Sequence, residues 1–175
     1  SQLAFLAADE ATLDTNLRAN PMSPDERDQF TQRFVTAQYH HALGPATELS
    51  VQGYYNGAGG WYRIADGAGG LYQYDLDWSS VGATASYHAV RGPFDVTWGG
   101  HANDFESRHA RALVDGPGEY ENRGFKNEVN SFVKLGYASG RWRHYGDVQV
   151  RWARFRFEGD VDLGSVAWTF FNPKV

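Results

Sequence analysis

The sequence contains no cysteine and a single methionine among its 175 residues. The lack of cysteine excludes disulfide bonds, zinc–thiolate sites and cysteine nucleophiles within this chain. No apolar run approaches the ~20 residues that a membrane-spanning helix needs, which excludes a helical membrane protein. Basic residues do not predominate, with 16 Lys and Arg against 21 Asp and Glu, so we expect no nucleic-acid partner. A transmembrane β-barrel stays open, because only alternate residues of a spanning strand meet lipid.

Aromatic residues and glycine are abundant instead. Aromatic side chains make up 15% of the chain, with 6 Trp and 10 Tyr, and 20 Gly accompany them. This combination suits long strands with aromatic girdles at a membrane interface better than it suits a helical core.

The stretch from Glu128 to Glu158 alternates with the period of a β-strand and predicts one long hairpin with its turn at 138–141. Trp142 and Trp152 bracket its apolar face ten positions apart, which at ~3.3 Å per residue and a tilt near 45° is about the height of a bilayer's apolar band. Aromatic rings with a polar edge favour both borders of that band. The expected girdle residues are Trp98, Tyr137, Trp142 and Trp152.

Two further hairpins of the same design are predicted between residues 29 and 103, with turns at Gly44-Pro45 and Gly92-Pro93. Residues 56–72 and 104–124 are rich in glycine or polar residues and are predicted to be long loops at the opposite end. Residues 1–28 are expected to form an external loop with a helical turn. Short turns at one end and long loops at the other are typical of outer-membrane barrels.

The fold class predicted is therefore all-β, an antiparallel up-and-down transmembrane β-barrel segment of about six to seven strands. The apolar residues should lie on the convex outer face and the polar ones on the concave face. The alternative is a soluble β-barrel binding module, which would place its apolar side chains inward around a small apolar ligand. The convex set is Val96, Val133, Leu135, Val148 and Val150, and the concave set is Gln52, Thr97, Gln149 and Arg151.

The end of the chain resembles a known family. Residues 168–175, Trp-Thr-Phe-Phe-Asn-Pro-Lys-Val, resemble the Phe-Asn-Pro-Lys segment in the barrel of TonB-dependent outer-membrane receptors. Three other stretches look like the same barrel region: 52–62, which reads Gln-Gly-Tyr-Tyr-Asn-Gly-Ala-Gly-Gly-Trp-Tyr, 120–126, Tyr-Glu-Asn-Arg-Gly-Phe-Lys, and 147–151, Asp-Val-Gln-Val-Arg. Together they span most of residues 30–175.

The resemblance implies a non-enzymatic transporter of the bacterial outer membrane that takes up a scarce solute, such as a ferric siderophore, another metal chelate or a vitamin-like cofactor. It implies as partners the outer membrane with its lipopolysaccharide, the receptor's own plug domain and TonB, and it implies no bound cofactor. Seven strands are too few for the 22-stranded barrel of the family, and neither a plug domain nor a TonB-contacting segment is recognisable. We therefore expect residues 1–175 to be an internal part of such a barrel, with the plug domain and the C-terminal strands outside it.

Two groups of residues are candidates for the function. The first alternates with the apolar residues of the long hairpin and is expected to face a wet lumen or the plug domain, with direct solute contact as the rival interpretation. These residues are Arg143, Tyr145, Asp147, Gln149 and Arg151. The second group is expected in the external loops and combines aromatic rings with a guanidinium. Such a group can capture a chelate by stacking and charge, although packing of loops on one another explains it as readily. These residues are Trp61, Tyr62, Arg63, Trp168, Phe170 and Phe171.

Other polar clusters have simpler interpretations. Arg154 and Arg156 lie beyond Trp152, where a guanidinium either binds lipopolysaccharide phosphate or is merely solvated. His101, Asp104, Glu106 and His109 are close in sequence, but alternation separates their faces, so no metal site is predicted. Asp75 and Asp77 share a face and are expected to be solvated carboxylates. Neither an HExxH pair nor a nucleophile elbow is present, which leaves a β-rich hydrolase as the weakest interpretation.

Overall fold

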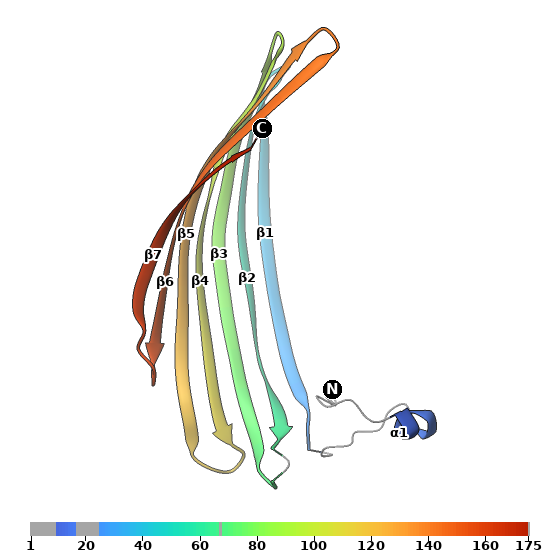
Figure 1. The fold of residues 1–175 in the computed structure, drawn as a ribbon, viewed down its shortest axis with the longest axis vertical. Coiled ribbons are helices and arrows are strands. Elements are labelled where there is room, and N and C mark those ends of the chain that lie inside the picture. The colour runs from blue at the N-terminus through green and yellow to red at the C-terminus, as the bar shows by residue number, and fades with distance from the viewer. Residues whose placement is uncertain (1–9, 17–24, 67, 175) are drawn as a thin grey trace.

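The computed structural model describes residues 10–16, 25–66 and 68–174. All of its strands form a single antiparallel sheet, which a short helix precedes in the chain (Figure 1). Each strand pairs with its sequence neighbour in the order β1-β2-β3-β4-β5-β6-β7. The elements are α1 (Glu10–Thr15), β1 (Asp28–Gly44), β2 (Thr47–Ala65), β3 (Leu71–Arg91), β4 (Phe94–Leu113), β5 (Gly118–Ser139), β6 (Trp142–Gly159) and β7 (Gly164–Lys174). The predicted up-and-down all-β fold is confirmed. Of the expected external loop 1–28, residues 10–16 and 25–28 are described. They contain α1 and, at Asp28, the first residue of β1, so the predicted loop extends one residue too far.

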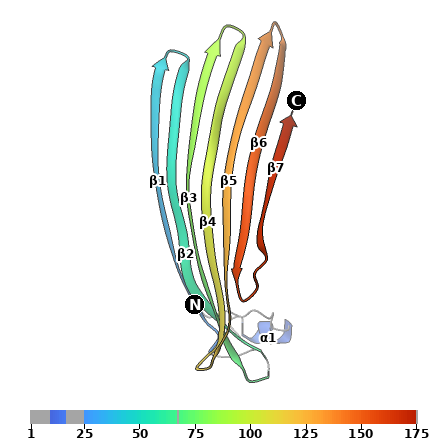
Figure 2. The same ribbon diagram turned by 90° about the vertical axis from the view of Figure 1, so that its left-hand side faces the viewer.

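The turns between β1 and β2, β3 and β4, and β5 and β6 all lie at one end of the sheet, as the alternation predicted (Figure 2). Two of these turns use a glycine in the left-handed conformation, with φ of 57° at Gly92 and 58° at Gly140. Glycine adopts this conformation without the steric penalty of a Cβ, which suits a two-residue hairpin connection.

The predicted long loops at the other end are wrong. Residues 56–65 and 71–72 belong to β2 and β3, and most of 104–124 belongs to β4 and β5, so the connections shrink to 66–70 and 114–117. Glycine and polar residues indicated loops there, yet extended strands accept both where neither face needs apolar cover. In the first connection the Asp66 carboxylate accepts hydrogen bonds from the backbone N–H groups of Ala68 and Gly70, both at 2.8 Å, which closes the turn.

The sheet has almost no core of its own. Within the described residues, the buried apolar side chains are Ala89 and Ala153. Large apolar side chains such as Trp98, Val148 and Phe171 are exposed instead. A soluble sheet buries one face against another layer of structure, whereas this one leaves both faces uncovered. The chemistry of the two faces therefore indicates what surrounds them.

Candidate functional site

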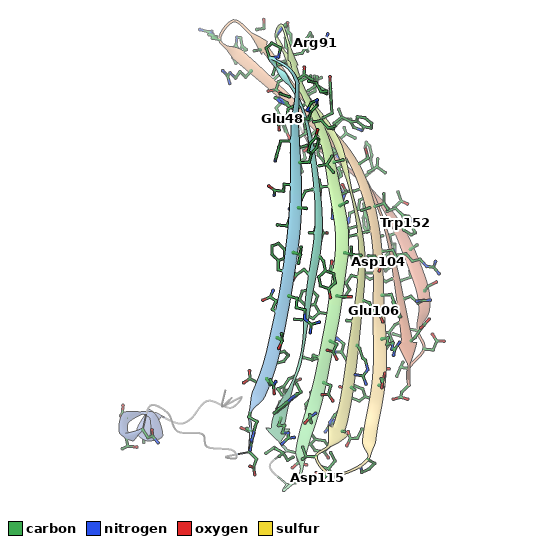
Figure 3. The ribbon with its side chains drawn as sticks, turned by 180° about the vertical axis from the view of Figure 1, so that it is seen from behind. Glu48, Arg91, Asp104, Glu106, Asp115 and Trp152 are labelled. Atoms are coloured by element: carbon green, nitrogen blue, oxygen red, sulfur yellow. The ribbon has the colours of Figure 1, made fainter. Side chains whose placement is uncertain are left out.

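Strand register assigns the side chains to two chemically different faces. Because paired residues share a face, the rows that run across the sheet can be read directly from the pairing. The first face carries a continuous apolar band. Its members are Tyr39, Val51, Val81, Ala85, Val96, Trp98, Val129, Val133, Leu135, Val148, Val150, Trp152 and Phe171. Figure 3 shows Trp152, from this band, on the convex side of the bowed sheet, and Glu48, from the opposite face, on the concave side.

All four expected girdle residues lie on the band face. Trp98 pairs with Val133, and Trp152 pairs with Val129, so each continues an apolar row. The Tyr137 ring contacts the Phe94 ring in a tilted arrangement, with 5.1 Å between ring centres, near the short turns. Trp142 pairs with Ser139 beside the β5–β6 turn. Aromatic side chains thus occur near both edges of the band, as at a membrane interface.

Beyond the apolar band, toward the β2–β3 and β4–β5 connections, the same face becomes densely charged. We call this region the charged belt, and its members are Asp77, Asp104, Glu106, Arg108, Glu121, Arg123, Arg154, Arg156 and Glu158. Arg108 donates to both oxygens of Glu121, at 2.8 and 2.9 Å, and Arg123 lies 3.8 Å from the same carboxylate. The sharp change from apolar to charged residues along single strands marks a boundary between two environments.

The Arg108–Glu121 pair gives a pH prediction. Hydrogen bonds from Arg108 lower the pKa of Glu121 below its ordinary value of 4.5. A carboxyl with a lowered folded-state pKa stabilises the fold above its unfolded-state pKa, and this contribution disappears as the pH falls through the lowered pKa. We therefore expect Glu121→Gln to reduce the free energy of unfolding at pH 7 and to have no such effect near pH 2. Chemical denaturation of the parent protein and of the variant across this pH range measures the difference in their free energies of unfolding. A difference that does not change with pH would contradict the pairing.

The concave face is polar over most of its area. The predicted residues Arg143, Tyr145, Asp147, Gln149 and Arg151 all lie on this face, as do Gln52 and Thr97. Arg151 donates to Glu128 at 2.7 Å, and Lys126 approaches the same carboxylate oxygen at 2.7 Å. The single negative charge of Glu128 therefore faces two positive side chains, so the three residues together keep a net positive charge.

A partly buried hydrogen-bond network on the concave face was not predicted. The Tyr54 hydroxyl lies 2.8 Å from His101 Nε2, and the Asn103 amide donates to Tyr54 at 2.8 Å and to Ser80 at 2.7 Å. These groups come from three adjacent strands, so only their register reveals the network. Satisfied networks of this kind hold side chains in fixed positions.

The six candidate solute contacts do not form one cluster. Tyr62, Trp168 and Phe170 lie on the concave face, whereas Trp61, Arg63 and Phe171 lie on the band face. The last three aromatic candidates belong to strand β7 and not to an external loop, because Trp168 pairs with Ala153, Phe170 with Arg151 and Phe171 with Val150. This corrects the predicted placement of residues 168–171.

Around Trp168 and Phe170 the concave face becomes aromatic. The Trp168 ring meets Phe155 edge-on at 5.6 Å, and the guanidinium of Arg151 lies 5.9 Å from the Phe170 ring centre. A second aromatic group, of which only Tyr62 was predicted, lies near the β2–β3 and β4–β5 connections. Tyr62 stacks on Tyr74 at 4.9 Å, and Arg111 lies 4.0 Å above the ring of Tyr72. Their residues are too far apart in sequence for alternation to group them.

The suspected histidine and carboxylate cluster is separated, as expected. His101 and His109 lie on the concave face, and Asp104 and Glu106 lie on the band face. Across residues 10–16, 25–66 and 68–174, no group of three or more histidine or acidic side chains is placed to hold a metal ion.

None of the helical structure in the described part of the chain is long and apolar enough to cross a membrane.

Comparison with known proteins identifies the architecture. No family model matches the sequence, and no curated protein sequence matches it. Among solved structures, the unliganded ferric citrate transporter FecA superposes with a TM-score of 0.78 over 94% of this chain, at 13% identity. The copper transporter OprC gives 0.72 over 85% at 13% identity, and the ferric yersiniabactin uptake receptor FyuA from Yersinia pestis gives 0.61 over 88% at 9% identity.

The match covers 27%, 27% and 26% of those three chains, so this chain spans about a quarter of their length. All three are transporters or uptake receptors and not enzymes. The seven strands, their order and their bowed shape are those of one part of a closed barrel. The chain has the fold of a segment of the barrel wall of TonB-dependent receptors.

Proposed function

We propose that this chain is part of the barrel wall of an outer-membrane transporter that takes up a scarce solute such as a ferric siderophore, another metal chelate or a vitamin-like cofactor. The observation that carries the proposal is the apolar band on the convex face of a sheet that, within the described residues, has almost no core. An exposed apolar surface of this extent is unstable in water and is stabilised when lipid covers it. The fold of the uptake receptors above supports the same function.

The soluble binding module is disfavoured by the same observation. A soluble barrel places its apolar side chains on the concave side around a ligand and its polar side chains toward water. Here Gln52, His101 and Arg151 lie on the concave side, and Val133 and Val148 lie on the convex side.

The outer strands β1 and β7 each have one edge without a partner strand among the described residues. Open edges of this length favour aggregation unless further strands pair with them. We infer that further strands close the barrel, that a plug domain and its contact with TonB belong to the complete protein, and that the residues before β1 are an external loop. The wall residues Arg143, Tyr145, Asp147, Gln149 and Arg151 then face the lumen or the plug.

The charged belt then lies at the level of the outer-leaflet head groups, and contact with lipopolysaccharide is part of the proposal. Arg154 donates to Ser165 at 3.3 Å, and Arg156 lies 3.2 Å from Glu158 and 4.1 Å above the Phe125 ring. Both guanidinium groups therefore already have partners within the sheet, which weakens their predicted role as phosphate ligands.

Of the aromatic candidates, Tyr62, Trp168 and Phe170 are proposed as solute contacts, because they share the concave face with the cationic Lys126 and Arg151. Aromatic rings next to a local positive charge suit a bulky anionic chelate. Phe171 is excluded from this role by its place in the apolar band.

Phe170→Ala in the complete protein should raise the half-saturating solute concentration for uptake about tenfold, since one such contact contributes roughly 1.4 kcal/mol. Phe171→Ala is the matched control, because it removes the neighbouring ring from the opposite face, and it should leave uptake unchanged. The measurement is uptake of radiolabelled iron chelates, copper complexes and a corrinoid by cells with and without the gene. The proposal would be contradicted if deletion of the gene reduced the uptake of none of these solutes, or if the two variants had equal effects.

A further inference from the structure

A groove of about 550 Å³ opens on the band face at the border between the apolar band and the charged belt. It crosses β1 to β5 and is lined on its apolar side by Tyr55, which shares a row with Val35 and Val81. Along its other side lie Arg33, Ser79 and Glu106, and the last of these is visible in Figure 3. The groove therefore borders apolar side chains and charged ones at once.

Two glycines of β2 form the floor of the groove. A Cβ at Gly57 would lie 2.9 Å from the Tyr55 hydroxyl, and a Cβ at Gly59 would meet the Asp77 carboxylate. Larger residues at these positions would fill the space that the tyrosine ring and the carboxylate now border. The groove thus depends on the glycines that the sequence pattern assigned to a loop.

The groove also contains charges that the sheet does not neutralise. Within the described residues, the side chains of Arg33 and Glu106 have no hydrogen-bond or ion-pair partner, whereas Arg108 and Arg123 both reach Glu121. Arg33 and Glu106 occupy one row across four strands, Arg33, Gly57, Ser79 and Glu106. They are therefore separated by three inter-strand spacings, about 14 Å.

We propose that this groove binds the phosphorylated saccharide head group of a glycolipid of the outer leaflet. Arg33 supplies the forked donor that matches a phosphate. Glu106, Asp77 and Ser79 accept hydrogen bonds from sugar hydroxyls, and the Tyr55 ring borders the pyranose and the first acyl carbons. A site for a simple anion would not include two carboxylates, because they repel it.

The acyl chains have a matching surface directly below. The row next to Tyr55 on the apolar side consists of the small residues Ala37, Gly53, Ala83 and Ala102, which leave the band shallow there. A lipid held by its head group in the groove lays its chains on this shallow stretch. The inference rests on the proposed function in one respect, that the band faces the outer leaflet.

The test is lipid binding by the complete protein in detergent micelles, measured by native mass spectrometry with purified diphosphoryl lipid A as the probe. Arg33→Ala should weaken binding about tenfold or more, the effect of losing one charge-assisted hydrogen-bonded pair. Ser79→Trp should block the groove and weaken binding similarly. Arg91→Ala is the matched control, because it removes a positive charge from the same face at the opposite end and should change binding less than twofold.

Two further probes separate the ligand sources. Dephosphorylated lipid A should bind weakly and equally to the parent and Arg33→Ala, and phosphatidylglycerol should bind without sensitivity to Ser79→Trp. Equal losses in Arg33→Ala and Arg91→Ala, or phosphatidylglycerol binding as tight as that of lipid A, would overturn the inference. Insertion into vesicles and solute uptake remain normal in those outcomes, whereas a failure of the proposed function would abolish both in the parent protein.

Discussion

Replacing Val148 with arginine is expected to lower the free energy of unfolding of the complete protein in lipid vesicles by about 2–4 kcal/mol. Val148 lies in the middle of the apolar band, paired with Val133 and Pro173, and its side chain is 42% exposed. A guanidinium at this position would have to enter the hydrocarbon or distort the bilayer to reach water, and both are unfavourable. Reversible unfolding by denaturant in vesicles measures the effect.

Gln149→Arg is the control for the Val148 substitution. Gln149 is the next residue along β6 and lies on the concave face beside Asp147 and Lys134. An arginine there stays in a polar environment, so the same chemical change should have a far smaller effect. Equal penalties at 148 and 149 would mean that lipid does not cover the band face, and a larger penalty at 149 would mean that the two faces are exchanged.

Much of the fold could be predicted because it depends on a local pattern. In a strand every second side chain shares a face, so the alternation of Val133, Leu135, Val148 and Val150 with Lys134 and Gln149 identified both the strands and their faces. Glycine and proline at 44–45 and 92–93 identified two of the short turns in the same way. These signals need no knowledge of distant residues.

The extension of the strands beyond the apolar band could not be predicted by this reasoning. Asp75, Asp77, Arg108 and Arg123 are polar although they lie on the same face as the apolar band. Alternation of polarity therefore ends there while the hydrogen-bonded ladder continues. Composition then indicates a loop although the backbone is extended. The ladder, and not the polarity pattern, determines where such strands end.

The site depends still more on register. Tyr54, His101 and Asn103 form a network across about fifty residues of sequence, and Arg33 and Glu106 border one groove from β1 and β4. A shift of one residue in any strand pair would exchange the faces and separate these groups. Sequence alternation gives the face of each residue, but not the residue opposite it.

The second large effect is expected at Gly60, where Gly60→Ala should destabilise the complete protein by about 1–3 kcal/mol, the usual penalty for overpacking. Gly60 pairs with Phe30 of β1 and Leu76 of β3. A Cβ there would contact the carbonyl oxygen of Gln29 and lie 2.8 Å from the Cα of Phe30. Both obstacles are backbone atoms, so β1 itself must shift, and no side-chain rotation relieves the contact.

Gly53→Ala provides the matched comparison within the same strand. Nothing lies within 4 Å of a Cβ built on Gly53, so alanine fits there and reduces the conformational entropy of the unfolded chain. We expect a gain of about 0.4–1 kcal/mol for this variant. The two substitutions are chemically identical, and denaturant unfolding in vesicles therefore isolates the close approach of β1 to β2. Equal effects of the two substitutions would show that Gly60 tolerates a side chain. A loss of unfolding free energy confined to Gly60→Ala would show that strand packing requires glycine there, because a loop residue at this position would accept alanine without penalty.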